Sequence, residues 1–375
     1  RRVGRHLAHR AAGASVKILA RRVEAAGAPV PHSRPCLDAA DESAALRVLR
    51  SGRLAPGAEA ARLEAFLARL ADAADAVALS SGTTALTLAL RALGLGARDR
   101  VAIPSYACAA LLHAVRASGA TPLICDIEPE SLALDPEEPA RRGGPAPRAA
   151  VVVHPFGVPV RLEPFRARGL VVIEDCAQAL GASDRGRPVG ARGEAAVFSF
   201  APTKIVTCGG PGGGLASPRA ALVRAARDLA THDEKSDDAA RVNGLMGDLQ
   251  AAIGVAQIGR LKEFVDRRAA IAARYDSAFA ALPVRRPPVP EGARPVVFRY
   301  LLRLQGAGRL IESLNRCGVA ARRPVFLPLH RLTGAAGAFP ASEAAHAELV
   351  SLPIHPSLSD AEVERVIDEV KRCRP

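Results

Sequence analysis

Lys204 is the residue of this chain whose position most strongly suggests chemistry. Among 51 lysines and arginines in 375 residues, only five are lysine, and Lys204 lies between the strand-like apolar run 195–200 and the glycine cluster 209–214. In α/β enzymes, a strand end followed by a glycine-rich turn carries functional groups. A primary amine there can form a Schiff base with a carbonyl cofactor, which arginine cannot do. A solvated loop lysine is the simpler interpretation while Lys204 is taken alone.

Asp175 ends a second apolar run, 29 residues before Lys204. The run 170–173 followed by two acids predicts a buried parallel strand that ends in a functional turn. A carboxylate at that tip is well placed to hold a protonated ring nitrogen, the partner that pyridoxal phosphate requires as an electron sink. Asp is also favoured as a helix N-cap, so Asp175 alone leaves both interpretations open.

A third segment predicts an anion site. Residues 75–79 favour a strand, 80–84 a small-residue turn and 85–93 a helix. A helix N-terminus presents free backbone N–H groups and the positive end of the helix dipole. Gly82 would let the backbone approach an anion closely, and Thr83 adds a hydroxyl donor. An ordinary capped helix explains this segment equally well by itself.

An amine, a carboxylate and an anion-binding turn in one α/β chain together indicate pyridoxal phosphate. At this level the chain resembles the DegT/StrS type of pyridoxal-phosphate-dependent sugar aminotransferase, a branch of the aspartate-aminotransferase-like type I fold. The matching segments follow the family's order and extend over roughly residues 29 to 375. They are 51–57, 81–86, 101–106, 153–157, 173–182, 198–204, 243–252 and 352–356.

The resemblance implies an aminotransferase that moves an amino group from an amino acid, expected to be L-glutamate, to a keto-sugar in a biosynthetic pathway. The sugar is expected to be nucleotide-linked. Lys204 would form the Schiff base and then carry a proton between substrate and cofactor. Asp175 would pair with the ring nitrogen, and Gln178 would lie over the hydroxyl side of the ring.

The same resemblance implies a phosphate site shared between two subunits. Gly82, Thr83 and Ser199 would hold the phosphate, and Asn243 would reach the phosphate of the neighbouring subunit in a homodimer. The implied fold is α/β, with a large domain built on a mixed, mostly parallel seven-stranded sheet and a smaller C-terminal α+β domain. We expect a basic N-terminal extension at 1–28, the large pyridoxal-phosphate-binding domain at 29–262 and the small domain at 263–375.

The chain departs from the family at four positions on the expected substrate side of the cofactor. Cys108 replaces the aromatic that stacks on the ring, although Tyr106 could compensate. Ala201 replaces His or Tyr, Gly210 an acid and Leu245 an arginine. These changes keep two alternatives open, namely a pyridoxal-phosphate enzyme with an altered reaction or a non-sugar substrate, and a cofactor-binding partner without activity. A nucleotide-binding enzyme ranks last, because 209–214 lacks the phosphate-loop and dinucleotide patterns.

Composition excludes several other classes. The net charge of +13 comes almost wholly from arginine, and no basic run is interleaved with aromatic residues as in a single-strand nucleic-acid platform. No apolar run reaches membrane-spanning length, and seven irregularly spaced cysteines argue against a disulfide framework or a metal site. We expect a cytoplasmic enzyme with no nucleic-acid, membrane or metal partner, and with a surface helix rather than a secretory signal at its N-terminus.

Several C-terminal elements complete the expectation. The apolar stripe of 249–268 predicts one long helix that continues towards Tyr275 and links the domains. Residues 296–304 alternate like a strand, 310–318 predict a helix with a glycine C-cap, and 360–372 predict the last helix. His330 and Arg323 could face the substrate, but a structural role is favoured for each.

Overall fold

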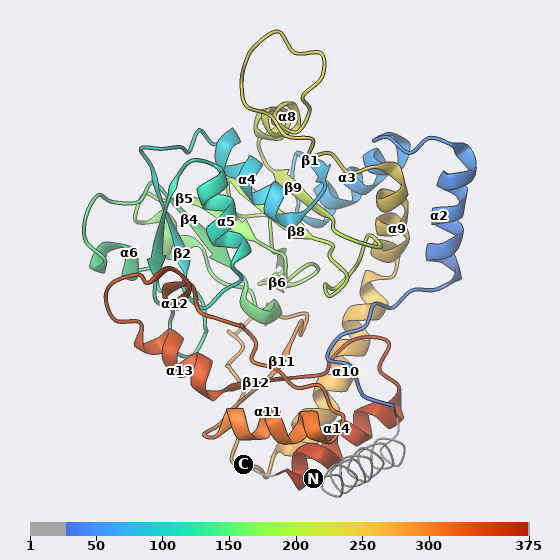
Figure 1. Ribbon diagram of the computed structural model, residues 1–375, viewed down its shortest axis with the longest axis vertical. Coiled ribbons are helices and arrows are strands. Elements are labelled where there is room, and N and C mark those ends of the chain that lie inside the picture. Colours follow the sequence, from blue (N-terminus) through green and yellow to red (C-terminus); the bar gives the residue numbers. More distant parts are fainter. Residues whose placement is uncertain (1–27, 374–375) are drawn as a thin grey trace, which may run out of the picture.

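The main feature of the computed structural model, which describes residues 28–373, is a seven-stranded sheet (Figure 1). The strand order is β1-β9-β8-β5-β4-β2-β3; β9 is antiparallel to both neighbours and the other pairs are parallel. The strands are β1 (Asp75–Leu79), β2 (Arg100–Pro104), β3 (Thr121–Cys125), β4 (Ala149–Val153), β5 (Val171–Asp175), β8 (Ala195–Ser199) and β9 (Gly213–Ser217). The predicted mixed, mostly parallel sheet is therefore confirmed.

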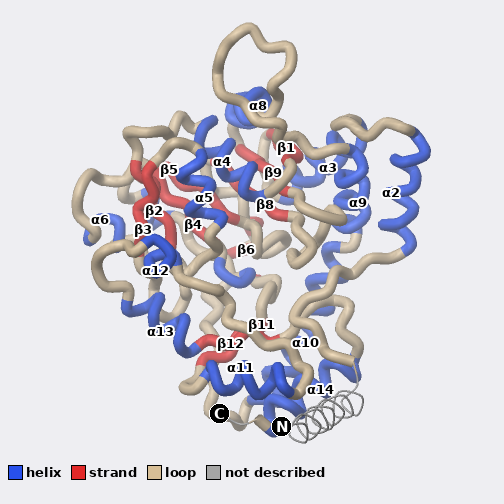
Figure 2. Tube along the Cα trace, in the orientation of Figure 1, coloured by secondary structure: helices blue, strands red, loops and turns tan. Residues whose placement is uncertain are grey.

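Helices cover both faces of this sheet, which explains its continuous apolar strands (Figure 2). In β4, Val151 and Val153 pack with the helices of one face, whereas Ala150 and Val152 pack with Phe165 on the other. The first face is covered by α4 (Gly82–Ala92), α5 (Ala110–Ala117) and α8 (Ala220–Leu229). The second is covered by α3 (Ala58–Leu70), α7 (Glu163–Arg166) and α9 (Asp248–Gly259). Among the helices of residues 28–373, none is long and apolar enough to cross a bilayer.

A smaller α+β part lies below the sheet in Figure 1 and has its own core. Its antiparallel strands β11 (Tyr300–Arg303) and β12 (Leu349–Leu352) pack with α10 (Leu261–Phe279), α11 (Ala307–Arg316) and α14 (Asp360–Arg372). The rings of Tyr275 and Tyr300 meet edge to face at 4.9 Å in this core. The predicted smaller α+β unit is confirmed, and the last helix has the predicted bounds.

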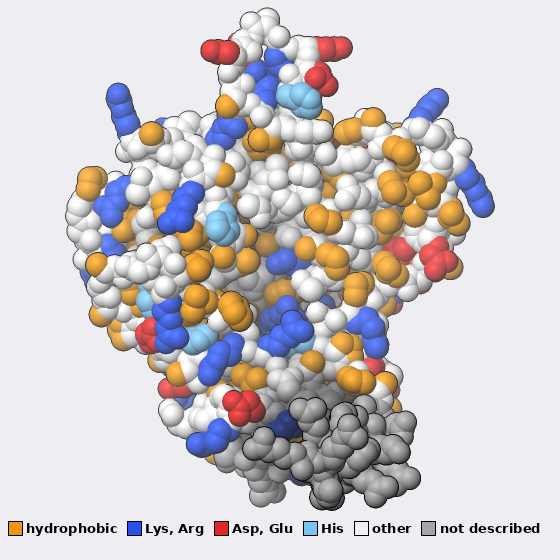
Figure 3. Space-filling model, viewed as in Figure 1, with side chains coloured by type: hydrophobic (Ala, Val, Ile, Leu, Met, Phe, Trp, Pro, Cys, Tyr) orange, Lys and Arg blue, Asp and Glu red, His pale blue; other side chains and the backbone are white. Residues whose placement is uncertain are grey.

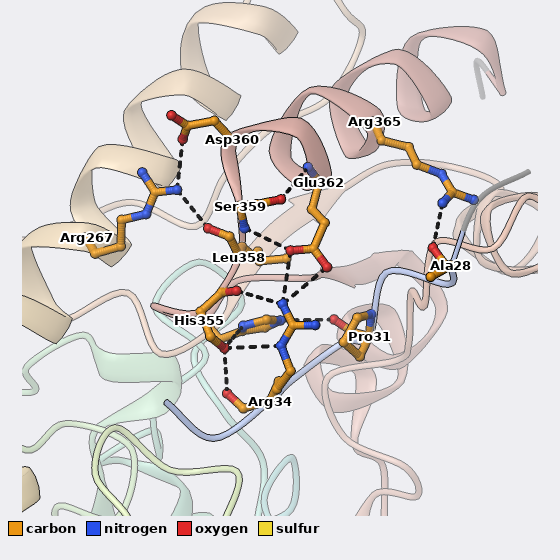
Figure 4. A network of polar contacts seen from close by, with 11 residues as sticks. Ala28, Pro31, Arg34, Arg267, His355, Leu358, Ser359, Asp360, Glu362 and Arg365 are labelled. Carbon is orange, nitrogen blue, oxygen red and sulfur yellow. Dashed lines mark hydrogen bonds and ion pairs between the residues drawn. The ribbon is translucent and has the colours of Figure 1, made fainter. Parts of the chain in front are cut away.

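The first described residues run along this smaller part (Figure 4). Val30 is fully buried in its core and donates its N–H to Gly318. Arg34 donates to both carboxylate oxygens of Glu362, and His355 hydrogen-bonds the carbonyl of Pro31. The remaining elements are α2 (Ala39–Ser51), α6 (Glu138–Arg141), α12 (Leu329–Thr333), α13 (Pro340–Glu348), β6 (Ser183–Asp184), β7 (Arg187–Pro188), β10 (Ala293–Arg294) and a 3₁₀ turn, Pro155–Gly157. The predicted N-terminal extension at 1–28 falls, except for its last residue, outside the described residues.

Two predicted elements differ from the structure. The single helix expected over 249–268 is two helices, α9 and α10, because Arg260 leaves the helical conformation at φ −102° and ψ 6°. The two halves have different packing partners: α9 packs against α2 and α3, whereas α10 packs against α14. The strand expected over 296–304 begins only at Tyr300, since Val297 has a φ of 42°.

A buried hydrogen-bond network anchors the strand that ends in Asp175. Glu174 is fully buried, and its carboxylate accepts hydrogen bonds from His154 at 3.1 Å and from the backbone N–H groups of Gly190, Arg192 and Gly193 at 2.9, 2.7 and 2.5 Å. Burial opposes the charge, but these hydrogen bonds outweigh it and lower the pKa of Glu174 to about 2. The network ties the loop 190–193 and the end of β4 to β5.

Because the pKa of Glu174 is lowered from 4.5 to about 2, its charge contributes about 3 kcal/mol of stability above pH 4.5, and this contribution is lost as the pH falls towards 2. We expect Glu174→Gln to lower the free energy of unfolding at pH 7 by about 3 kcal/mol or more and to flatten its dependence on pH below 4.5. Denaturant titrations followed by circular dichroism measure both. Glu163→Gln, at an exposed carboxylate, is the control; equal effects of the two variants would contradict this account.

Candidate active site

Seven predicted site residues converge on one cavity of about 340 Å³ at the carboxyl edge of the sheet. Strands β1, β5 and β8 run in the same direction, so the turns that follow them open at one edge. The residues that line the cavity are Gly82, Thr83, Cys108, Asp175, Gln178, Ser199 and Lys204. Asn243 is exposed and lies outside this lining.

The turn before α4 is both a capped helix and a potential anion site. Ser81 is the N-cap, and its hydroxyl accepts the N–H of Thr84 at 3.0 Å. Among the residues that the structure describes, no acceptor takes the N–H groups of Gly82 and Thr83, which line the cavity. A Cβ on Gly213 would lie 2.4 Å from the Gly82 nitrogen, so only glycine lets β9 approach this turn. Two free N–H groups at a helix N-terminus are suited to a phosphate.

Lys204 and Asp175 supply an amine and a carboxylate whose charges are both opposed by burial. Burial lowers the pKa of Lys204, although Asp175 opposes this shift. Burial also raises the pKa of Asp175, against the N–H of Ala177 and the charge of Lys204. Asp175 Oδ1 accepts that N–H at 2.9 Å, while within residues 28–373 Oδ2 receives no hydrogen bond. A cation in the cavity would therefore stabilise Asp175 as a carboxylate.

The amide of Gln178 has a defined orientation. Its oxygen must accept the N–H of Phe156, at 2.8 Å, because a backbone N–H can only donate. The amide NH₂ group then remains as a hydrogen-bond donor for a ligand in the cavities that Gln178 lines. Phe156 holds its N–H in place through a left-handed backbone, with φ at 55°. An amide donor in this position suits an oxygen substituent on a ring bound in the cavity.

The four departures from the family are not all at the cavity. Cys108 and Ala201 line it, but Gly210 does not, and Leu245 pairs with Leu79 beside the sheet. Within one chain, only Cys108 and Ala201 lie at the cavity, so the expectation for Gly210 and Leu245 stays a prediction. Tyr106 does not line the cavity that contains Asp175; its ring is buried against Phe156 and its hydroxyl donates to Ala345 at 3.4 Å.

The structure favours a structural role for His330 and Arg323, as expected. His330 hydrogen-bonds Ser105 at 2.6 Å and Glu343 at 2.7 Å, and its ring stacks on Phe339. Arg323 donates to the carbonyl of His346. Both side chains are held by protein partners, and neither lines the cavities around Lys204.

A second cavity of about 510 Å³ adjoins the first and shares Cys108, Gln178 and Lys204 with it. Phe298 and Arg299, which the sequence did not single out, form part of its wall. Nothing in the local pattern distinguishes Arg299 from the many other arginines of this chain. Space-filling shows lysine and arginine side chains gathered around a central hollow (Figure 3).

The polar groups of the first cavity fit pyridoxal phosphate. The free N–H groups of Gly82 and Thr83 match a phosphate, the unpartnered oxygen of Asp175 matches a protonated ring nitrogen, and Lys204 matches an aldehyde. All three chemical demands are met within one cavity. A solvated loop lysine and a purely capping Asp175, the simpler interpretations from sequence, do not explain this convergence.

Comparison with known proteins places the cavity in context. The sequence model of the DegT/DnrJ/EryC1/StrS aminotransferase family matches residues 35–371. The chain is 34% identical over 349 residues to dTDP-3-amino-3,4,6-trideoxy-alpha-D-glucose transaminase of Streptomyces venezuelae, covering 89% of this chain and 92% of that protein. It is 30% identical over 337 residues to UDP-N-acetyl-3-dehydro-alpha-D-glucosamine 3-aminotransferase of Acidithiobacillus ferrooxidans, with 87% and 91% covered. The crystal structure of S. venezuelae DesV with a ketimine intermediate has a TM-score of 0.84 and 33% identity, with 91% and 98% covered.

The close approach of β9 to the anion site is testable. We expect Gly213→Ala to weaken the affinity for pyridoxal phosphate by about tenfold or more, because its methyl group would push the Gly82 nitrogen away. Absorbance titration measures the affinity. Gly210→Ala is the matched control, since its Cβ would meet only the end of the Gln250 side chain at 3.9 Å. Equal affinities in the two variants would contradict the role assigned to this turn.

Proposed function

The chain belongs to the DegT/DnrJ/EryC1/StrS aminotransferase family, and on that premise we propose that it uses pyridoxal phosphate to transfer an amino group from L-glutamate to a nucleotide-linked keto-sugar, as a cytoplasmic homodimer. The observation that carries the proposal is the convergence of Lys204, Asp175 and two free backbone N–H groups on one cavity. The bound cofactor supplies an aldehyde that condenses with amines and a ring that accepts the electron pair of a substrate carbon.

The side chains and backbone of the cavity have separate roles in this reaction. Burial lowers the pKa of Lys204, which favours the neutral amine and so allows Nζ to act as nucleophile and then to take and return a proton. Asp175 holds the positive charge of a ring nitrogen, and Gln178 donates to the ring's oxygen substituent. The N–H groups of Gly82 and Thr83, with the hydroxyl of Ser199, orient the phosphate.

The proposed acceptor follows from the relatives and the second cavity. Two relatives are transaminases of dTDP- and UDP-linked sugars, as their names state. The cavity of about 510 Å³ beside Lys204 offers room for the sugar of such a substrate. Cys108 and Ala201 leave small side chains on the wall of the cofactor cavity, so an altered reaction or a non-sugar acceptor is the second candidate.

The first test is spectroscopic. We expect purified protein, loaded with pyridoxal phosphate and desalted, to show a visible absorption band that L-glutamate removes, because the amine of Lys204 binds the cofactor aldehyde. Lys204→Ala should lack this band and lose amino transfer by about a hundredfold or more. Lys204→Arg keeps a long basic side chain and should fail equally, since a guanidinium cannot condense with an aldehyde.

Each other outcome selects a different function. A Lys204-dependent band that glutamate leaves unchanged would favour another donor or altered chemistry on the same cofactor. Full biological activity of Lys204→Ala would favour a non-catalytic partner. Absence of the band in the unmodified protein would overturn the assignment of the cofactor.

A homodimer would also give Asn243 a role. Asn243 is exposed and outside the cavity of its own chain, as expected of a residue that serves a partner's phosphate.

Large apolar side chains are exposed on and beside α2, namely Leu37, Leu46, Leu49 and Leu54, and Figure 3 shows hydrophobic side chains gathered in that region. Covering this surface with a second copy would remove it from water.

Subunit mixing tests this arrangement. Lys204→Ala and Asn243→Ala homodimers should each be weakly active, but exchanged heterodimers should regain activity, because one of their two sites combines an intact Lys204 with an intact Asn243. Amino transfer measured before and after subunit exchange gives the answer. No gain in a sample shown by native mass spectrometry to contain heterodimers would mean that Asn243 acts within its own chain or has no role.

A further inference from the structure

Arg299 lies in the wall of the second cavity and, among the described residues, has no anionic partner. In residues 28–373, no carboxylate lies within ion-pair distance of its guanidinium. Its one hydrogen-bonding partner is Nδ1 of His32, at 3.1 Å, and its Cζ lies 4.5 Å from the centre of the Phe298 ring. A half-buried charge of this kind is costly unless an anion compensates it.

The guanidinium is held in a fixed position. Arg299 can only donate, so Nδ1 of His32 accepts, and Nε2 must carry the proton that it shares with the hydroxyl of Ser351 at 2.9 Å. His32 and Ser351 are both buried, and burial together with Arg299 lowers the pKa of His32 to about 3. His32 is therefore neutral at physiological pH. It orients Arg299 without adding or removing charge.

Two further arginines strengthen the positive field at this place. Arg268 is 3% exposed and donates to the carbonyls of Phe298 and Ile354, so it too lacks an anion among the described residues. Arg322 is exposed. The burial of Arg299 and, to a smaller extent, the charge of Arg322 lower the pKa of Arg299 to about 10. These three cations, which lack a counter-ion among the described residues, would attract an anion to Arg299, the one of them that lies in the cavity wall.

We propose that Arg299 binds an anionic group of a substrate, a carboxylate or a phosphate, and so determines which substrates reach Lys204. This inference rests on the function proposed above and extends it to a residue that neither the resemblance nor the motifs identified. A guanidinium presents a planar pair of N–H donors that matches both kinds of anion. His32 is then a positioning residue, because it reaches the substrate only through Arg299.

The distances suit one substrate that contacts both residues. Lys204 Nζ lies 5.3 Å and Arg299 Cζ 4.5 Å from the centre of the same Phe298 ring. Their separation is therefore at most about 10 Å, whichever sides of the ring they occupy. An anionic group a few bonds from the reacting carbon spans such a distance. The carboxylates of a dicarboxylic amino donor and the diphosphate of a nucleotide-linked acceptor both meet this condition.

Calorimetric titration of the pyridoxal-phosphate-loaded protein tests the inference with two probes, 2-oxoglutarate for the carboxylate and dTDP for the diphosphate. We expect Arg299→Leu to weaken binding of one probe by about tenfold or more, and Arg299→Lys to weaken it less. Arg294→Leu removes an equal charge from an exposed site outside both cavities and should change neither affinity by more than about twofold. Thermal unfolding and the visible band check that each variant is folded and loaded.

Some outcomes identify which substrate supplies the anion, and others overturn the role of Arg299. A loss confined to 2-oxoglutarate assigns Arg299 to the amino donor, and a loss confined to dTDP assigns it to the acceptor. Affinities unchanged in Arg299→Leu, or wild-type protein that binds neither probe, overturn the inference. If Arg299→Leu does not fold, Arg299→Gln, which removes the charge but keeps a polar side chain, takes its place, and both affinities intact in that variant overturn the inference equally. Absence of the visible band in the unmodified protein would instead overturn the proposed function, whereas unchanged affinities in protein that shows the band overturn only the role of Arg299.

Discussion

The central sheet is buried on both faces, and this burial determines where polar groups near the core can lie. Strands covered by helices on each side hold almost only apolar residues, so polar groups that must be near the core collect where strands end. Here the ends of β1, β5 and β8 carry the turn of Gly82, the carboxylate of Asp175 and the segment of Lys204. One cavity thus receives a helix N-terminus, an acid and an amine from three distant parts of the chain.

The same burial tunes these groups. It moves both Lys204 and Asp175 towards their neutral forms, and the neutral amine is the form that attacks a carbonyl. Next to Asp175 in the chain, Glu174 has the opposite character, because four hydrogen bonds keep it ionised. Two adjacent acids therefore differ in role: one anchors the strand, and the other leaves an oxygen for a ligand.

The smaller part of the molecule contributes the outer wall of the site. Phe298 and Arg299 lie just before β11, and their segment crosses to the cavity because the N–H groups of Val296 and Phe298 bind the carbonyls of Gly157 and Phe156. The first described residues join this wall through His32, whose ring connects Arg299 to Ser351 of β12. Residues far apart in sequence thus surround the space in front of Lys204, where a substrate would have to be recognised.

The parts of the fold that depend on local interactions were predictable from the sequence alone. The apolar runs of β1, β5 and β8, the capped helix after Ser81 and the dipole-matched last helix follow from periodicity and end residues, and Lys204, Asp175 and Gly82 follow from what strand ends hold. Which side chains meet across the chain depends on tertiary packing. The expected long helix is divided at Arg260, Gly210 and Leu245 lie outside both cavities, Tyr106 lies outside the cavity that contains Asp175, and Arg299 lies in the wall of the second cavity. Packing partners and unpaired charge depend on neighbours that no local pattern specifies.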